Sequence, residues 1–123
     1  MKNKNKPRHY IGKDGLETWR LNGQFHRDDG PVLIQHGSKF WYKYNKQHRE
    51  DGPAIEWIGG VKSWYLNDKL CRINGPAIEH EDGTKTFILN NAFCIEYDYW
   101  KEMCKQGHIT KEELIIKLLS IEK

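Results

Sequence analysis

Apolar and polar positions alternate along short stretches between residues 17 and 90. Four pairs of apolar residues are separated by one residue: Trp19 and Leu21, Tyr42 and Tyr44, Trp64 and Leu66, and Phe87 and Leu89. A period of two is typical of a half-buried strand. The pattern predicts strands at 17–22, 39–45, 62–67 and 85–90, and shorter runs predict strands at 32–36, 54–58 and 77–81. Each shorter strand and the longer strand that follows it are therefore expected to form a β-hairpin, which is one unit of the chain.

Turn residues separate the predicted strands. Gly37, Gly60 and Gly83 lie between the two strands of a unit, and asparagine ends the longer strands at 22, 45, 67 and 90. Both residue types permit the positive φ that tight hairpins require. The interval from Trp41 to Asn45 is one residue longer than in the other units, so we expect a β-bulge there.

A motif of Arg-x-(Asp/Asn)-Gly-Pro connects the units and occurs three times, at 27–31, 49–53 and 72–76. Its glycines, at 30, 52 and 75, are 22 and 23 residues apart. Proline cannot donate to a ladder, so it marks the start of a strand. A fixed period of this length is typical of solenoids, in which each unit contacts its neighbours. The expected fold is mainly β, with stacked antiparallel hairpins in a single-layer twisted sheet.

Two helical patterns follow the last repeat. Residues 96–105 have helical spacing with Gly107 as a stop, and Thr110 and Glu113 form a capping box. The second pattern has an apolar stripe: Leu114, Ile115, Leu118, Leu119 and Ile121. Because the last unit of a solenoid must cover its open edge, we expect the helices to cap the sheet or pack on one face. Alternatively, the last helix docks a partner or a second copy of the chain.

The chain divides into a basic flexible arm at 1–11, hairpin repeats at 12–92 and a helical cap at 93–123. The 123 residues include 20 Lys and Arg and 17 Asp and Glu, a net charge of +3. That excess is too small to indicate nucleic-acid binding by itself. Lys2, Lys4, Lys6, Arg8 and Lys13 nevertheless concentrate positive charge at the start of the chain. The arm is either a solvated tail or a contact for nucleic acid or an acidic protein.

Cysteine usage and hydropathy favour a cytoplasmic protein. Cys71, Cys94 and Cys104 are an odd number without close pairing, which fits a reducing compartment. No apolar run approaches the ~20 residues of a membrane span, and no apolar region follows the basic start as in a secretory signal. We therefore expect no membrane span.

Histidine and cysteine occupy one equivalent position in four units: His26, His48, Cys71 and Cys94. These residue types bind zinc, but equivalent positions two strands apart are separated by ~10 Å. Zinc ligands must lie ~2.0–2.3 Å from a single ion. We therefore expect no metal, no cofactor, and no disulfide between Cys71 and Cys94.

Two series of side chains are candidates for contact with a partner. The arginines of the motif could face an anionic ligand, although a residue present in every unit is expected to serve the unit by pairing with a local acid or turn carbonyl. The central aromatic residues could stack bases, with Lys43 and Lys62 between them, bind a protein, or form the core of the sheet. The candidate partner-binding residues are Trp41, Trp57, Tyr65, Arg27, Arg49 and Arg72. Trp57 is the first candidate, since Gln35 and His80 occupy its place in the other copies.

The repeat phrases resemble the MORN-repeat variant family over residues 12–92. The residues that carry the resemblance are WYLND at 64–68, HREDGPA at 48–54 and DG at 82–83. Arg-x-Asp-Gly-Pro stands where the simple MORN pattern has Gly-x-Gly. The resemblance implies a twisted sheet of stacked hairpins. It also implies a bacterial antitoxin-like or immunity-like protein, or a phage or giant-virus protein.

The expected function is a non-catalytic protein-binding module, specifically a small inhibitor that blocks a toxin, a host defence or a host enzyme. A nucleic-acid or anionic-ligand binder that uses the basic arm and the arginine row is the first alternative. An enzyme is the second, and it would need a non-repeated polar cluster near Glu96, Tyr97, Asp98 and His108. The sequence has no Gly-rich phosphate loop, nucleophile elbow or Cys-x-x-Cys, so we expect no catalytic residues.

Overall fold

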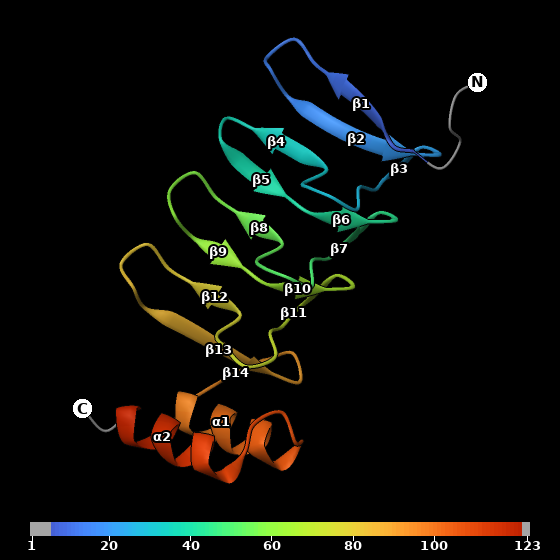
Figure 1. The fold of residues 1–123 in the computed structure, drawn as a ribbon. Coiled ribbons are helices and arrows are strands. Elements are labelled where there is room, and N and C mark those ends of the chain that lie inside the picture. Colours follow the sequence, from blue (N-terminus) through green and yellow to red (C-terminus); the bar gives the residue numbers. More distant parts are fainter. Residues whose placement is uncertain (1–5, 122–123) are drawn as a thin grey trace.

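The computed structural model describes residues 6–121 as a stack of antiparallel hairpins with two helices at one end (Figure 1). Ten strands form one sheet in the order β1-β2-β4-β5-β8-β9-β12-β13-β14, with β3 paired to β2. Their bounds are β1 (Arg8–Ile11), β2 (Glu17–Leu21), β3 (Gln24–Phe25), β4 (Leu33–Gln35), β5 (Ser38–Phe40), β8 (Ile55–Glu56), β9 (Lys62–Ser63), β12 (Ile78–Glu79), β13 (Lys85–Leu89) and β14 (Ala92–Cys94). The predicted class, mainly β with stacked hairpins and a helical cap, is confirmed.

The long strands of the two central units are interrupted at a tryptophan. Trp41 separates β5 from β6 (Tyr42–Lys43), and Trp64 separates β9 from β10 (Tyr65–Leu66). β6 then pairs with β7 (Lys46–Gln47), and β10 pairs with β11 (Lys69–Leu70), as small hairpins outside the main sheet. Each central unit therefore has an inner hairpin in the sheet and an outer hairpin beyond it (Figure 1).

The prediction of a β-bulge between Trp41 and Asn45 is wrong. Tyr44 and Asn45 have φ of 48° and 67° and form the outer turn of their unit. Positive φ at both central residues defines a type I′ turn, and the equivalent turns at 22–23, 67–68 and 90–91 have the same property. Tyr44 thus occupies the position of Asn22 and Asn67, and the second unit contains no extra residue. Its ring stacks on His26 at 4.0 Å between centroids, a contact that favours this conformation.

The register places different side chains on the two faces of the sheet, since successive residues point to opposite sides. One row of paired positions is almost entirely charged: Glu17, Ile34, Lys39, Glu56, Lys62, Glu79 and Lys85. The row on the opposite side is largely apolar: Thr18, Leu33, Phe40, Ile55, Ser63, Ile78 and Thr86. We call these sides the charged face and the apolar face. Directly opposed unlike charges stabilise the charged row.

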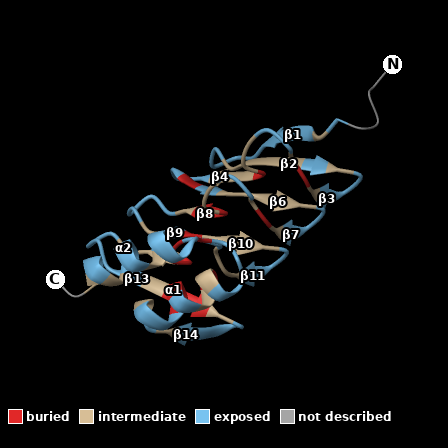
Figure 2. Cartoon of the chain, turned by 60° about the horizontal axis from the view of Figure 1, so that its bottom comes forward, coloured by how far each residue is buried: buried red, intermediate tan, exposed pale blue. Residues whose placement is uncertain are grey.

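The helices α1 (Glu96–Lys105) and α2 (Lys111–Ile121) cover the last unit. Phe87 of β13 packs with four buried residues of the cap in the one large apolar cluster of the described chain: Tyr99, Trp100, Met103 and Ile109. Figure 2 shows buried residues in α1 and in short segments along the hairpins. Neither helix in residues 6–121 has the length and apolar character needed to cross a bilayer. The expected cap is therefore observed at the end of the stack.

We call the three copies of the Arg-x-(Asp/Asn)-Gly-Pro motif, at 27–31, 49–53 and 72–76, the first, second and third repeat loops. Tyr99 joins the cap to the third repeat loop. Its side chain is fully buried, and its hydroxyl accepts a hydrogen bond from the Gly75 amide at 3.0 Å and donates one to the Arg72 carbonyl. Burial raises the pKa of the Tyr99 phenol, so the hydroxyl keeps the proton that it donates.

Several details at the two ends of the chain differ from the expectation. The predicted basic arm at 1–11 includes β1, because the backbone of Arg8–Ile11 pairs with β2; residues 1–5 lie outside the described residues. The capping box forms as predicted, with Thr110 and Glu113 exchanging side chain–backbone hydrogen bonds at 3.0 and 3.1 Å. In the predicted stripe, however, Ile115 and Leu119 are 58% and 60% exposed. Only the other side of α2 packs on the core.

Replacing Tyr99 by Phe should destabilise the protein by about 1–3 kcal/mol, because a buried amide and carbonyl lose their partner while the ring is retained. Chemical denaturation monitored by tryptophan fluorescence measures the change. Tyr97→Phe is the matched control, since Tyr97 lies on the same helix and is 44% exposed. Equal stability of the two variants would show that the Tyr99 hydroxyl does not hold the cap.

Candidate functional site

Each repeat loop folds over the tryptophan of its own unit. The guanidinium carbons of Arg27, Arg49 and Arg72 lie 3.8–3.9 Å from the ring centroids of their tryptophans, which are Trp19, Trp41 and Trp64. On the other side of the guanidinium lies the motif glycine. A Cβ added there would be 2.7–2.8 Å from the arginine Cζ. The glycine is therefore needed for close approach, and each unit contains a Trp–Arg–Gly sandwich.

The guanidinium groups are also satisfied by local acceptors. Arg49 donates to the Asp51 carboxylate, the Pro53 carbonyl and the Glu56 carboxylate, each at 3.0 Å. Arg27 makes the equivalent bonds to Asp29 and Pro31, and Arg72 makes those to Pro76 and Glu79. The expected local pairing of the arginines is confirmed. Their side chains are 22–28% exposed, and their donors are directed into their own unit.

The Arg49 donation lowers the pKa of the exposed Asp51 carboxyl below its usual range. A carboxyl whose pKa is lower in the folded state contributes stability above its unfolded pKa, and this contribution is lost as the pH falls through the folded pKa. The Asp51–Arg49 pair therefore persists through mildly acidic conditions.

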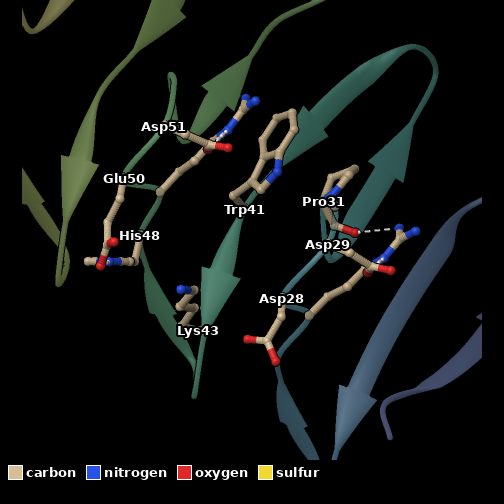
Figure 3. Close-up of a pocket in the computed structure, with 11 residues that line it drawn as sticks. Asp28, Asp29, Pro31, Trp41, Lys43, His48, Glu50 and Asp51 are labelled. Carbon is tan, nitrogen blue, oxygen red and sulfur yellow. Dashed lines mark hydrogen bonds and ion pairs between the residues drawn. The ribbon is translucent and has the colours of Figure 1, made fainter.

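A first cavity of about 490 Å³ lies between the first and second repeat loops (Figure 3). Trp41 and Lys43 line it from the strand side, and Pro31 adds a second apolar surface. Four carboxylates surround its mouth, and their side chains are 74–87% exposed: Asp28, Asp29, Glu50 and Asp51. A ligand that approaches this cavity meets carboxylates before it reaches either arginine.

A second cavity of about 590 Å³ lies between the second and third repeat loops. Trp64 and Arg72 line it as Trp41 and Arg49 line the first cavity. Three other equivalent positions differ in polarity. Leu66 and Cys71 of the second cavity replace Lys43 and His48 of the first, and Ile73 of the third loop replaces Glu50 of the second loop. Arg49, Glu50 and Asp51 line the second cavity as well. The same framework therefore encloses a polar cavity and a cavity with one apolar side.

The two histidines at equivalent positions, His26 and His48, connect successive units. The Nδ1 atom of His26 accepts from the Tyr44 amide at 3.2 Å, and that of His48 accepts from the Asn67 amide at 3.0 Å. Each Nε2 lies 3.1 Å from a carboxylate oxygen of its own loop, in Asp28 and Glu50 respectively. Both ring nitrogens of each histidine thus have a polar partner within the repeat array.

The outer turns repeat a second connection between units. The Asn45 amide donates to the Phe25 carbonyl at 2.9 Å, and the Asn45 side chain accepts from the Phe25 amide at 2.8 Å. Asp68 makes the same two bonds to Gln47, at 2.9 and 2.6 Å. A turn residue with a side-chain oxygen therefore fixes the distance between neighbouring outer hairpins.

The apolar face carries the second group of candidates. Trp57 is 46% exposed and meets the Phe40 ring edge-on at 5.2 Å. The next residue along the chain, Ile58, lies in the turn and is 73% exposed. We call Phe40 and Trp57 the Trp57 patch. Ile55 of the same face is only 7% exposed, so the patch rests on a packed base.

The six predicted partner-binding residues do not form one site. Trp41 and the arginines belong to the charged face with the loops, whereas Trp57 and the half-buried Tyr65 belong to the apolar face. Lys43 lines the first cavity with Trp41, and Lys62 lies in the charged row. Strand alternation therefore separates the two lysines from Trp57 and Tyr65, which does not favour the alternative in which the lysines lie between stacked bases.

The cavity residues Leu66 and Ile73 were not predicted as site residues, and Lys43 was named only beside the central aromatic residues. The available signal was their difference in polarity at equivalent places in otherwise similar units. Comparisons with protein-family models, curated proteins and solved structures found no match. Relation to the MORN-repeat variants stays a prediction from the motifs.

Arg49→Lys should lower the free energy of unfolding by about 1–2 kcal/mol. An ammonium cannot stack on Trp41 and at the same time donate in the fork geometry that Asp51 and Glu56 accept. Urea denaturation measures the loss. The exposed Arg8 supplies the control, and Arg8→Lys should stay within about 0.5 kcal/mol of wild type. A neutral Arg49→Lys change would mean that the sandwich does not stabilise the unit.

Proposed function

We propose that this protein is a non-catalytic module that binds another protein through the Trp57 patch. The observation that carries the proposal is the exposure of Trp57, at 46%, on a face that is otherwise apolar along its centre. Tryptophan is enriched among the residues that dominate protein–protein affinity. A large ring supported by Phe40 offers contact area at little cost in conformational entropy.

The position of the helices supports this proposal. α1 packs against β13 at one end of the stack, and Figure 1 shows the remaining hairpins as a single layer. The Trp57 ring, which packs beside Phe40 of β5, is therefore accessible to a partner. Trp57 follows β8 at the start of the turn to β9. Its amide donates to the Val61 carbonyl at 3.0 Å and its carbonyl accepts from the Gly60 amide at 2.9 Å, so the ring is presented on a hydrogen-bonded turn.

Inhibition is the specific form that we propose. A rigid face that binds a protein stoichiometrically acts by occupying the surface of its partner. The resemblance to MORN-repeat variants implies antitoxin-like, immunity-like or phage proteins, which supports an inhibitor of a toxin, a host defence or a host enzyme. This step is an analogy between families.

The arrangement of polar groups favours binding over catalysis. The charged residues of the loops recur from unit to unit and pair with one another, whereas a catalytic constellation occurs once per site. Where the repeat ends, the Glu96 carboxylate accepts from the Trp100 indole at 3.0 Å. Glu96 therefore has a role in the cap.

A nucleic-acid partner is the alternative, and the charges argue against the arginine row as its site. The arginine side chains are less than a third exposed and ion-paired, while the neighbouring loop carboxylates are about three-quarters exposed or more. A polyanion would meet these carboxylates first. Arg8 of β1 remains an exposed cation at the far end of the stack.

Trp57→Ala should weaken partner binding by about 2 kcal/mol or more, the cost typical of a hot-spot residue. This is more than a tenfold change in Kd. Tagged wild-type protein recovers the partner from extracts of the source organism, and the Kd is then measured with the purified partner. Tyr97→Ala removes a ring of similar exposure elsewhere and should bind like wild type. Retention of full affinity by Trp57→Ala would exclude the patch. A steep loss of wild-type binding between about 50 and 200 mM salt would indicate nucleic acid instead.

A further inference from the structure

We propose that the first and second cavities form one groove that binds an extended, polyproline II-type segment of a protein, with a cationic and an apolar side chain three residues apart. This groove lies on the charged face among the repeat loops, opposite the Trp57 patch. It is a second binding site and does not depend on the proposed function of that patch.

The two cavities are adjacent. Arg49, Glu50 and Asp51 of the second repeat loop line both of them, so this loop is the partition between neighbouring compartments. Each compartment has a tryptophan on its strand side, Trp41 in the first and Trp64 in the second. A ligand that runs along the stack would therefore pass from one aromatic surface to the next.

The repeat distance selects the conformation of the ligand. Equivalent points of adjacent units are two strands apart, or ~10 Å. Polyproline II rises ~3.1 Å per residue with three residues per turn, so every third side chain returns to the same side after ~9.3 Å. A β-strand ligand places same-side chains at ~6.8 or ~13.6 Å. The step of the cavities thus matches polyproline II, a conformation that aromatic grooves bind in other proteins.

The first cavity favours a cation at its mouth. Arg27, Lys43 and Arg49 bring three positive charges to its lining, against the four carboxylates at its mouth. Each carboxylate also has a basic partner in its own loop, but the carboxylates are 74–87% exposed whereas the two arginines are 23% and 22% exposed. A ligand guanidinium at the mouth would reach several carboxylates and remain outside the floor, where Lys43 repels it.

The second cavity favours an apolar side chain. Leu66, Cys71 and Ile73 occupy the places that Lys43, His48 and Glu50 have in the preceding unit, and they form an apolar side opposite Glu50 and Asp51 of the second loop. Ile73 is 52% exposed at the rim, so an apolar ligand group would remove it from water. Because the same framework accommodates both sets of residues, the fold does not require an apolar rim here. The difference between the units is therefore a determinant of ligand choice.

Fluorescence anisotropy with labelled proline-rich peptides tests the proposal on the full chain. The probes have about nine residues, or three turns of polyproline II. They carry one Arg and one Leu separated by three positions, in either order. At least one order should bind saturably at one site, and peptides with a spacing of two should bind at least about tenfold more weakly, since the side chains then point in different directions.

Ile73→Glu replaces the apolar side of the second rim with a third carboxylate beside Glu50 and Asp51. It should weaken the Arg and Leu peptide at least about tenfold and strengthen a peptide with Arg at both positions, because the second rim loses its apolar side and becomes more acidic. Ile116→Glu introduces the same charge at an exposed site on α2, 67% exposed, and should leave both affinities unchanged. Trp57→Ala should also bind the peptides normally, which separates this groove from the patch.

Three outcomes would overturn the proposal: no saturable binding of either probe, affinities that do not depend on spacing, or unchanged peptide preference in Ile73→Glu. Displacement of the peptide by a single-stranded oligonucleotide that itself binds more tightly would assign the groove to nucleic acid. None of these results bears on the Trp57 patch, whose test uses a different variant and partner.

Discussion

The structure depends on the contact of an arginine guanidinium with an indole ring, held in place by a glycine. A single-layer sheet has no second layer to cover its central strands, so each unit must bury its own apolar surface. The loop that carries Arg49 folds back onto Trp41, and the residue after its proline, Ala54, becomes completely buried. Val32 and Ala77 are buried in the same way. The connection between hairpins is thus also their core.

The sequence predicts the features that depend on local chemistry. Period-two alternation and turn residues indicate the hairpins, and Thr110 with Glu113 indicates the start of the last helix. The interruptions at Trp41 and Trp64 could not be predicted, because they follow from where the next loop packs. Tyr44 hid the true position of its turn, since a tyrosine with positive φ is uncommon. Ile115 was predicted in the apolar stripe of the last helix, but it is exposed. Helical spacing alone does not show how much of an apolar stripe a small core covers.

The same distinction between local chemistry and packing applies to the candidate sites. Trp57 is visible in the sequence because it differs from Gln35 and His80 at equivalent positions. Which lysines accompany it depends on register and strand alternation, which only the structure gives. The two cavities were harder still to predict from the sequence, since each lies between loops from consecutive units. Residues more than twenty positions apart, such as Asp29 and Asp51, become opposite walls of one space.

The attachment of the cap has a consequence for how such a protein can change over generations. Tyr99 bonds to the third loop, and α1 packs on β13, so the cap is joined to the end of the array. Joints between earlier units repeat the same bonds, as Asn45 and Asp68 illustrate. An in-frame duplication of one unit in the gene would leave both ends of the protein intact. It would lengthen the stack by ~10 Å and add one compartment whose lining could then diverge by single substitutions.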